Sequence, residues 1–312
     1  MNIVKIVVIA LISISSIIFA ASIGLALYVI LPRKQSMQKT LDTDVQKGWI
    51  DIVSWNLWEK EQVTINSPYG YTIQGTWLPV THACGTMIFY HGHSWTRYGS
   101  LKYLPMFRNL GFNALIIDLR AHGASGGNTC TYGAREKDDG KACTDWVVAK
   151  TGGNHVIGLH GESLGAVAAL LHSSEDPRIA FVIADSAFSS LEEELIFHYK
   201  KLTRAPLFPV FTITKLLIPL FAGGFRLQDS KPIQTIQTLR APVLFIHGLA
   251  DDFTPHTMSI ALYEAIRAHG NAELALIPGA RHSQAIAVNP TLYEGHVITF
   301  LHKYGIIQNP PQ

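Results

Sequence analysis

Side chains that together can carry out nucleophilic catalysis follow separate apolar runs of this chain. Ser163 is the central residue of a G-E-S-L-G pentapeptide, which lies between an apolar run and an Ala/Leu-rich segment. Two carboxylates, Asp251 and Asp252, follow a later apolar run, and His282 follows another. A serine hydroxyl is a poor nucleophile at neutral pH and needs a base that is itself oriented by a third group. We therefore interpret Ser163 as a candidate nucleophile, with His282 and an aspartate as its candidate partners.

The glycines around Ser163 fit a tight turn from a strand into a helix. Such a turn holds its central residue in strained dihedral angles and brings neighbouring backbones together, so a side chain on either flank would clash. It also places the serine hydroxyl near the amino end of the helix, where free N–H groups favour developing negative charge. The alternative is a glycine-rich turn with an ordinary exposed serine, which the G-x-S-x-G pattern alone does not exclude.

A second glycine loop follows the apolar run at 86–90. Gly92 permits a sharp departure from the strand, so the backbone N–H of His93 can point at the space above Ser163. Together with the N–H of Leu164, it would supply two donors to an oxyanion. The alternative is a simple loop whose histidines make local hydrogen bonds.

Two further segments carry titratable residues for which we expect structural roles. In the glycine-rich loop at 118–127, we expect Asp118 and Arg120 to satisfy the backbone and each other. His296 and His302 lie in the terminal helical pattern, where we expect surface or packing positions.

The apolar runs predict the elements that must position these side chains. Continuous runs with helical patterns between most of them favour a mostly parallel sheet covered on both faces, in which ligand sites form beyond the carboxyl ends of the strands. The runs lie at 86–90, 114–117, 156–159, 179–184, 243–246 and 274–277. Earlier segments alternate apolar and polar residues, which predicts antiparallel strands at 49–57, 61–66 and 71–78.

In its motifs the chain resembles an α/β-hydrolase of the serine-hydrolase type, and it is similar to bacterial membrane-anchored or secreted esterase-like and peptidase-like members. The resemblance covers roughly residues 63–304 and rests on motifs in the family's order. These are the H-G-x loop at 91–93, the D-x-R-x-H-G-x-S-x-G loop at 118–127, G-x-S-x-G at 161–165, and an aspartate loop followed by a histidine loop. The resemblance implies a doubly wound, mostly parallel α/β sheet.

The resemblance also implies a role for each matching residue. Ser163 matches the nucleophile, and His282 matches the base that takes its proton and later returns it to the leaving group. Asp251 matches the acid, because the family pattern G-x-x-D-x-x-x-P falls on Gly248, Asp251 and Pro255. Its carboxylate would orient the imidazole and stabilise the imidazolium.

Two alternatives for the acid stay open at this point. Asp252 is one residue away from the matched position, so a small shift would exchange the two. Asp185 follows the run at 179–184, and some hydrolases of this fold draw their acid from that strand.

The amino-terminal segment predicts a membrane helix. An uncharged run at 6–31 lies between Lys5 and P-R-K at 32–34. At about 1.5 Å of rise per residue, it can span a bilayer core of roughly 30 Å. A cleaved signal peptide is the alternative, with small residues at 20–22, but cleavage there would leave an apolar amino terminus at 23–31. Positive charges on both sides leave the orientation of a single-pass membrane protein open.

We therefore expect an anchor at 1–34, a polar tether at 35–48 and a hydrolase domain at 49–312. A small helical cap at about 186–239 interrupts the strand rhythm, with helices at 191–202 and 208–221. We expect the E-E-E run at 192–194 to form a solvated face. The apolar residues of the cap would either line a cleft, which implies a partly apolar substrate, or pack helices on the sheet. They are Pro206, Leu207, Phe208, Pro209, Phe211, Phe221 and Phe225.

Composition narrows the function classes. The chain has 312 residues and a net charge of +2, without a basic block, so we do not expect nucleic acid as a partner. Cys84, Cys130 and Cys143 lack metal-ligand spacing, and we predict neither a metal nor a cofactor. We expect a serine hydrolase that cleaves a small-molecule carboxylic ester through an acyl-enzyme. The alternatives are a peptidase or amidase of the same fold and a non-catalytic binding protein on this scaffold.

Overall fold

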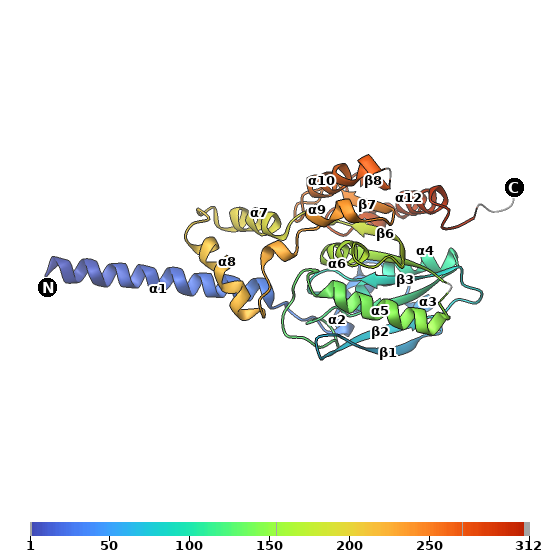
Figure 1. The fold of residues 1–312 in the computed structure, drawn as a ribbon, viewed down its shortest axis with the longest axis horizontal. Coiled ribbons are helices and arrows are strands. Elements are labelled where there is room, and N and C mark those ends of the chain that lie inside the picture. Colours follow the sequence, from blue (N-terminus) through green and yellow to red (C-terminus); the bar gives the residue numbers. More distant parts are fainter. Residues whose placement is uncertain (1, 154, 270, 309–312) are drawn as a thin grey trace.

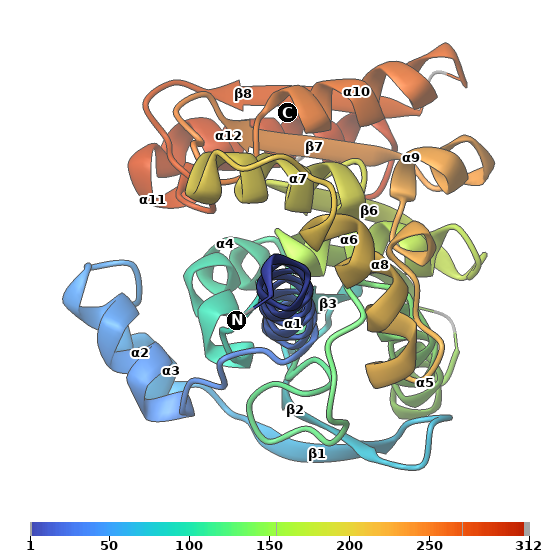
Figure 2. The same cartoon turned by 90° about the vertical axis from the view of Figure 1, so that its left-hand side faces the viewer.

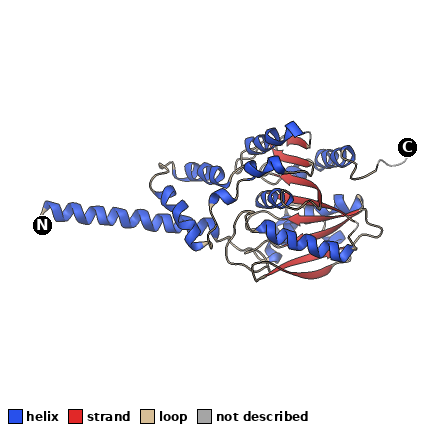
Figure 3. Ribbon diagram, viewed as in Figure 1, coloured by secondary structure: helices blue, strands red, loops and turns tan. Residues whose placement is uncertain are grey.

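The structure is a computed structural model that describes residues 2–153, 155–269 and 271–308 of the 312-residue chain. Its centre is one eight-stranded sheet in the described part of the chain, with helices on both faces (Figures 1 and 3). The strands lie in the order β1-β2-β4-β3-β5-β6-β7-β8. Their bounds are β1 (Glu61–Asn66), β2 (Thr72–Leu78), β3 (Gly85–Tyr90), β4 (Phe112–Ile117), β5 (Val156–Glu162), β6 (Ile179–Asp185), β7 (Val243–Gly248) and β8 (Ala272–Ile277).

The strand directions follow the hydropathy pattern. The alternating segments form β1 and β2, which pair antiparallel, and β2 also runs antiparallel to β4. The continuous apolar runs form β3 to β8, which pair in parallel. Every residue of β3, β4 and β7 is buried, as expected for strands covered on both faces. The predicted α/β-hydrolase-type sheet is confirmed.

The helices provide the two covering layers, the cap and an amino-terminal extension. They are α1 (Ile3–Ile30), α2 (Met37–Gln46), α3 (Ile52–Leu57), α4 (Leu104–Asn109), α5 (Glu136–Thr151), α6 (Leu164–Ser173), α7 (Leu191–Thr203), α8 (Val210–Phe221), α9 (Pro232–Thr235), α10 (Thr257–Ile266), α11 (Ala285–Val288) and α12 (Pro290–Lys303). Short 3-10 turns are η1 (Arg97–Tyr103), η2 (Leu227–Asp229), η3 (Ile236–Thr238) and η4 (Arg267–His269).

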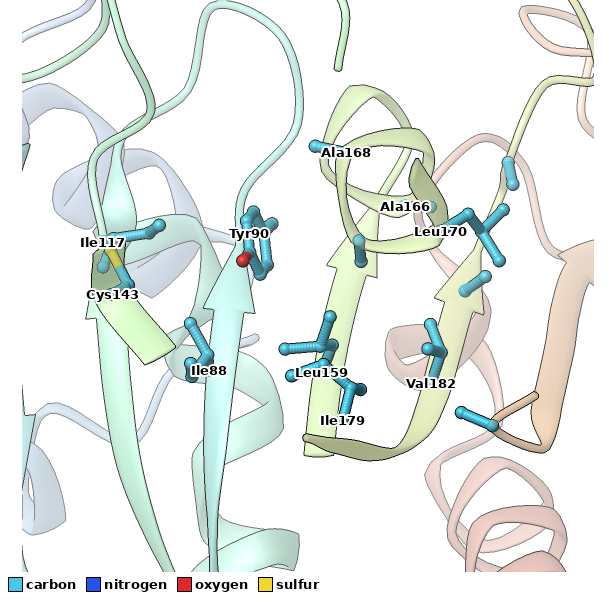
Figure 4. Close-up of a cluster of buried hydrophobic side chains, with 14 of the residues drawn as sticks. Ile88, Tyr90, Ile117, Cys143, Leu159, Ala166, Ala168, Leu170, Ile179 and Val182 are labelled. Atoms are coloured by element: carbon cyan, nitrogen blue, oxygen red, sulfur yellow. The ribbon is translucent and has the colours of Figure 1, made fainter. Parts of the chain in front are cut away.

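Alternate side chains of each strand enter different cores, because successive residues point to opposite faces of a sheet. Ile88 packs in the core beneath α5, α6 and α10, where Leu159 and Leu170 also lie (Figure 4). Its neighbours Met87 and Phe89 pack in the core beneath α4 and α12. The strands are therefore fixed in the sheet from both sides, and their carboxyl ends share one edge.

Two amino-terminal segments differ from their predictions. Residues 49–57, predicted to be a strand, contain helix α3, because the Asp51 carboxylate caps the N–H groups of Val53 (3.0 Å) and Ser54 (3.3 Å). Residues 35–48, expected to be a tether, contain helix α2, whose Asp44 side chain is buried. In the segment at 49–57, the short helix buries Trp55 and leaves Val53 and Leu57 exposed.

Helix α1 extends away from the body of the protein (Figure 1). Among the described residues it is the one helix long and apolar enough to cross a membrane. Within the predicted span at 6–31, one face of the last turns of α1 packs against the protein, whereas Tyr28 and Leu31 are exposed. Ser22, Ala26, Val29 and Ile30 are buried, and α8 lies beside this end of the helix (Figures 1 and 2).

The cap contains the two predicted helices, α7 and α8. Its aromatic residues do not line a cleft as a group: Phe211 and Phe225 are buried in a cluster that includes Ala26 and Ile30 of α1, whereas Phe208 is exposed. Phe211 and Phe225 therefore have a packing role, although they pack on α1 rather than on the sheet.

Candidate active site

The backbone at Ser163 is a strained turn between β5 and α6. Its dihedral angles are φ 56° and ψ −117°, in a region that non-glycine residues rarely adopt. A Cβ atom on Gly161 would lie 2.2 Å from the carbonyl oxygen of Gly165, and one on Gly165 would lie 2.1 Å from that of Tyr90. Only glycine fits at either position. The predicted strand-turn-helix context of Ser163 is present.

Ser163, His282 and Asp251 lie in one chain of hydrogen bonds. The Oγ of Ser163 is 2.9 Å from the Nε2 of His282, and the Nδ1 of His282 is 2.7 Å from the Oδ2 of Asp251. Asp251 follows β7, and His282 follows β8. A neutral imidazole that donates its Nδ1–H to the carboxylate can accept the serine proton at Nε2. The structure therefore brings together three side chains that are remote in sequence.

The Asp251 carboxylate is held in place from several sides. Its Oδ1 accepts the N–H groups of Phe253 and Thr254, each at 2.9 Å, and its Oδ2 is 3.1 Å from the Nε2 of His247. Burial alone would raise the pKa of this carboxyl. The hydrogen bonds from His247 and His282 outweigh burial, so the pKa lies well below its usual value. Asp251 is therefore an anion at neutral pH.

The hydrogen bond between Asp251 and His282 lowers the pKa of Asp251 but has the opposite effect on the pKa of His282. Burial lowers the pKa of its imidazole, but the hydrogen bond to Asp251 and the negative charge of that carboxylate outweigh burial. The pKa of His282 is raised above its usual value as a result. A base of this kind is strengthened by its partner, and it is protonated at a higher pH than a free imidazole.

The two alternative acids lie elsewhere. Asp252 is exposed and pairs with Arg281 at 3.3 Å and Lys201 at 3.6 Å. Asp185 is fully buried and accepts a hydrogen bond from the hydroxyl of Tyr103 at 3.0 Å. Burial and the nearby Glu162 raise the pKa of Asp185 to about 6. The hydrogen bonds of the His282 ring go to Asp251 and Ser163, and to neither of these two carboxylates.

His93 and Leu164 line the same cavity as Ser163. No protein acceptor among the described residues takes a hydrogen bond from the backbone N–H of either residue. Leu164 is also the first residue of α6, where the helix dipole favours negative charge. His91 has a local role, because its Nε2 accepts the Leu119 N–H at 3.0 Å.

The loop at 118–127 is structural, but its pairing differs from the prediction. Asp118 pairs with Arg97, whose Nη1 lies 2.6 Å from its Oδ2, rather than with Arg120. The guanidinium of Arg120 instead lies 5.4 Å from the centre of the Tyr71 ring. Arg97 lies in η1, so the partner of Asp118 comes from a separate segment of the chain.

A buried ion pair links the turn at Ser163 to the loop that carries His282. The Nζ of Lys102 is 2.6 Å from the Oε2 of Glu162, and it also donates to the carbonyl oxygen of Ser283 at 2.9 Å. Both charged side chains are about 95% buried, with exposures of 4% and 5%. One cation thus holds the residue before Ser163 and the residue after His282. Sequence reasoning missed Lys102 because it lies inside η1, without a motif around it.

A cavity of about 540 Å³ opens over Ser163, and most of its lining is apolar. Helix α7 contributes several residues that recur at helical spacing and so share one face, namely Leu191, Glu194, Leu195, His198, Lys201 and Leu202. This corrects the expectation that the E-E-E run is fully solvated, because Glu194 is 5% exposed. Its Oε2 atom has no hydrogen-bond partner among the described residues. The helical spacing of Leu191, Leu195 and Leu202 in the sequence would have indicated that Glu194 lies on the same face of α7.

His93, His122 and Cys130 form a cluster whose candidate ligand atoms lie within 4.8 Å of one another. Their separation in sequence concealed this proximity. Burial strongly raises the pKa of the Cys130 thiol in the protein alone, so this thiol is protonated unless a bound cation displaces its proton. We assign no metal role to the cluster.

A family model described as X-Pro dipeptidyl-peptidase (S15 family) matches residues 38–221. The uncharacterized protein YqkD of Bacillus subtilis is 33% identical over 286 residues, which cover 91% of this chain and 93% of that protein. The esterase Pf2001 of Pyrococcus furiosus has a TM-score of 0.65 at 25% identity, covering 79% of this chain and 93% of its own. An acylaminoacyl peptidase of Pyrococcus horikoshii shares the fold, with a TM-score of 0.61 at 14% identity, covering 83% of this chain and 44% of its own.

Lys102→Met is expected to lower the free energy of unfolding by about 3–5 kcal/mol, because it leaves the Glu162 carboxylate buried without its cation. The matched control is Lys215→Met, which breaks the exposed pair with Glu192 on the protein surface. That change should cost at most about 1 kcal/mol. Urea unfolding of the purified chain in detergent, followed by tryptophan fluorescence, measures both values. Equal effects for the two variants would contradict a special role for the Lys102 pair.

Proposed function

The chain belongs to the X-Pro dipeptidyl-peptidase (S15) family of serine hydrolases with the α/β-hydrolase fold, and from this premise we propose that it cleaves carboxylic esters with Ser163, His282 and Asp251. The observation that carries the proposal is the pair of hydrogen bonds through His282, at 2.9 Å to Ser163 and 2.7 Å to Asp251. This arrangement supports catalysis over a non-catalytic binding role, because each side chain meets the group that its chemical role requires.

The reaction follows from the positions of these groups. His282 takes the proton of Ser163 as the serine oxygen bonds to the ester carbonyl carbon. The backbone N–H groups of His93 and Leu164 stabilise the oxyanion, and each such donor contributes roughly 10²–10³ in rate. The C–O bond to the alcohol then breaks, and His282 gives its proton to the departing oxygen. Water hydrolyses the acyl-enzyme by the same steps and releases a carboxylic acid.

Two features support an ester rather than an amide as the substrate. The cavity lining is mostly apolar, and one structural neighbour, matched over 93% of its own length, is described as an esterase. Alcohols also leave more readily than amines, so an ester places a smaller demand on the general acid.

A peptidase is the second candidate, and one observation favours it besides the family description. The Oε2 of Glu194 is a buried carboxylate oxygen without a partner among the described residues, and Glu194 lines the cavity. The other oxygen, Oε1, accepts from Thr254 at 2.7 Å. A free ammonium group on a peptide would satisfy Oε2, and a substrate hydroxyl would do so too.

We further propose that α1 remains attached as a membrane anchor to a catalytic domain that begins near α2 and includes the cap at about 186–239. The packing of α1 supports this proposal. Ser22 is buried and its carbonyl oxygen accepts a hydrogen bond from Thr214, so cleavage at 20–22 would cut the helix where it already packs against the protein. Fractionation of cells followed by amino-terminal sequencing separates an attached anchor from a cleaved signal peptide directly.

Asp251→Asn is expected to lower kcat for an ester by about 10³–10⁴-fold, because the imidazole loses the partner that sets its tautomer. The acid limb of kcat/KM should also move to lower pH. His282 must be neutral to act, its pKa is raised by the Asp251 carboxylate, and the variant removes that effect. Asp252→Asn is the matched control and should retain kcat within about twofold. An unchanged pH profile in Asp251→Asn would contradict this assignment.

The wild-type chain is expected to hydrolyse p-nitrophenyl butyrate with a kcat/KM at least about 10²-fold above that for Ala-Pro p-nitroanilide, which carries a free amine. Glu194→Gln should change the butyrate rate by less than about threefold, because an ester without an amine makes no ion pair there. If the wild-type chain preferred the anilide and Glu194→Gln lost this preference, the esterase proposal would be wrong and the peptidase proposal would take its place.

A further inference from the structure

The last turns of α1 are built into the catalytic domain. The hydroxyl of Tyr132 donates to the carbonyl oxygen of Val29 at 2.7 Å, and the N–H of Cys130 donates to that of Ile30 at 2.8 Å. Further back along α1, the carbonyl oxygen of Ser22 accepts from the hydroxyl of Thr214 in α8 at 3.2 Å. This end of the apolar helix is therefore packed as part of the protein and is not joined to it by a flexible linker.

The same turns form a wall of the cavity over Ser163. Tyr28, Val29 and Leu31 line it on one side, and residues of α7 together with Phe253 add to the apolar lining. A substrate that reaches Ser163 must therefore pass beside the carboxyl end of the helix that we propose to be the membrane anchor.

The length of α1 places this cavity at the membrane surface. If Lys5 stays in the polar layer, a hydrocarbon core of roughly 30 Å takes up about twenty residues of helix and ends near residue 25. Tyr28 then lies about 5 Å beyond the hydrocarbon, within the headgroup layer. The cavity opens at the level where the ester bonds of lipids lie.

Helix α8 presents an unpartnered apolar face at this level. Its contact with Ser22 places it alongside the part of α1 that leaves the hydrocarbon, and Figure 2 shows the two helices side by side. The outer α8 face consists of Leu216, Leu220 and Phe221, which are 71%, 76% and 41% exposed, respectively. Exposed apolar patches of this kind mark contact surfaces, and the position beside a membrane helix identifies the bilayer as the occupant.

From these positions we propose that the substrate is a bilayer-resident ester with a long acyl chain, and that the outer α8 face rests on the membrane to admit it. This rests on the proposed function. The acyl chain would enter along the apolar wall formed by α1 and α7 while the ester carbonyl reaches Ser163. The net reaction adds one water and releases a fatty acid and an alcohol, with no other reactant.

The test uses the full-length chain reconstituted in phosphatidylcholine vesicles, with p-nitrophenyl palmitate in the bilayer and p-nitrophenyl acetate in the water. The double variant Leu216→Asp/Leu220→Asp should lower the palmitate rate by about tenfold or more, because two charges replace the apolar contact with the bilayer. The acetate rate should stay within about twofold, since neither leucine lines the cavity. Leu57→Asp is the matched control: it makes the same change at an 80% exposed leucine of α3, and neither rate should change.

A fall of both rates together in the double variant, or no fall in either, would overturn the proposal. So would a wild-type chain that hydrolyses acetate but not the palmitate in vesicles, and that result would leave the proposed function intact. Failure of the wild type on both esters would instead contradict the proposed function itself.

Discussion

The turn at Ser163 is the constraint on which the rest of the site depends. A residue with φ 56° and ψ −117° costs on the order of 1–3 kcal/mol, and such strain persists only where the surroundings fix it. Here β5 lies between β3 and β6, and α6 packs closely enough on β3 that Gly165 has no room for a side chain. The packed centre of the sheet thus holds the hydroxyl of Ser163 above its edge, and the other groups are arranged around that fixed point.

The partners of Ser163 reach it because parallel strands end at a common edge. β7 and β8 deliver Asp251 and His282 from loops that are far away in sequence, and the Lys102 ion pair joins the loop after β8 to the turn after β5. In such a buried pair, the desolvation cost is large and good geometry only offsets it. The pair therefore acts mainly by positioning: it holds the turn at Ser163 and the loop that carries His282 together.

Local patterns in the sequence predicted the sheet and the strand-end loops that carry Ser163 and His282, because glycine spacing and apolar runs act over a few residues. Those patterns left the acid open, and the family resemblance pointed to Asp251 rather than Asp252 or Asp185. The prediction for 49–57 failed for a local reason, because the Asp51 carboxylate caps a short helix, α3, in a segment whose alternation indicated a strand. Long-range contacts decided other outcomes: Glu194 faces a cavity because α7 packs with its apolar face inward. Lys102 and the buried end of α1 carry no local pattern at all. Their roles arise only when distant segments meet.

The central claim is that the hydroxyl of Ser163 is the activated nucleophile of this protein, and a fluorophosphonate probe tests it most directly because it reacts with such a serine and remains attached. Mass spectrometry of peptides from the labelled chain should find one phosphonate, on Ser163, and Ser163→Ala should remain unlabelled. Labelling of a different residue, or equal labelling of the Ser163→Ala chain, would contradict the account.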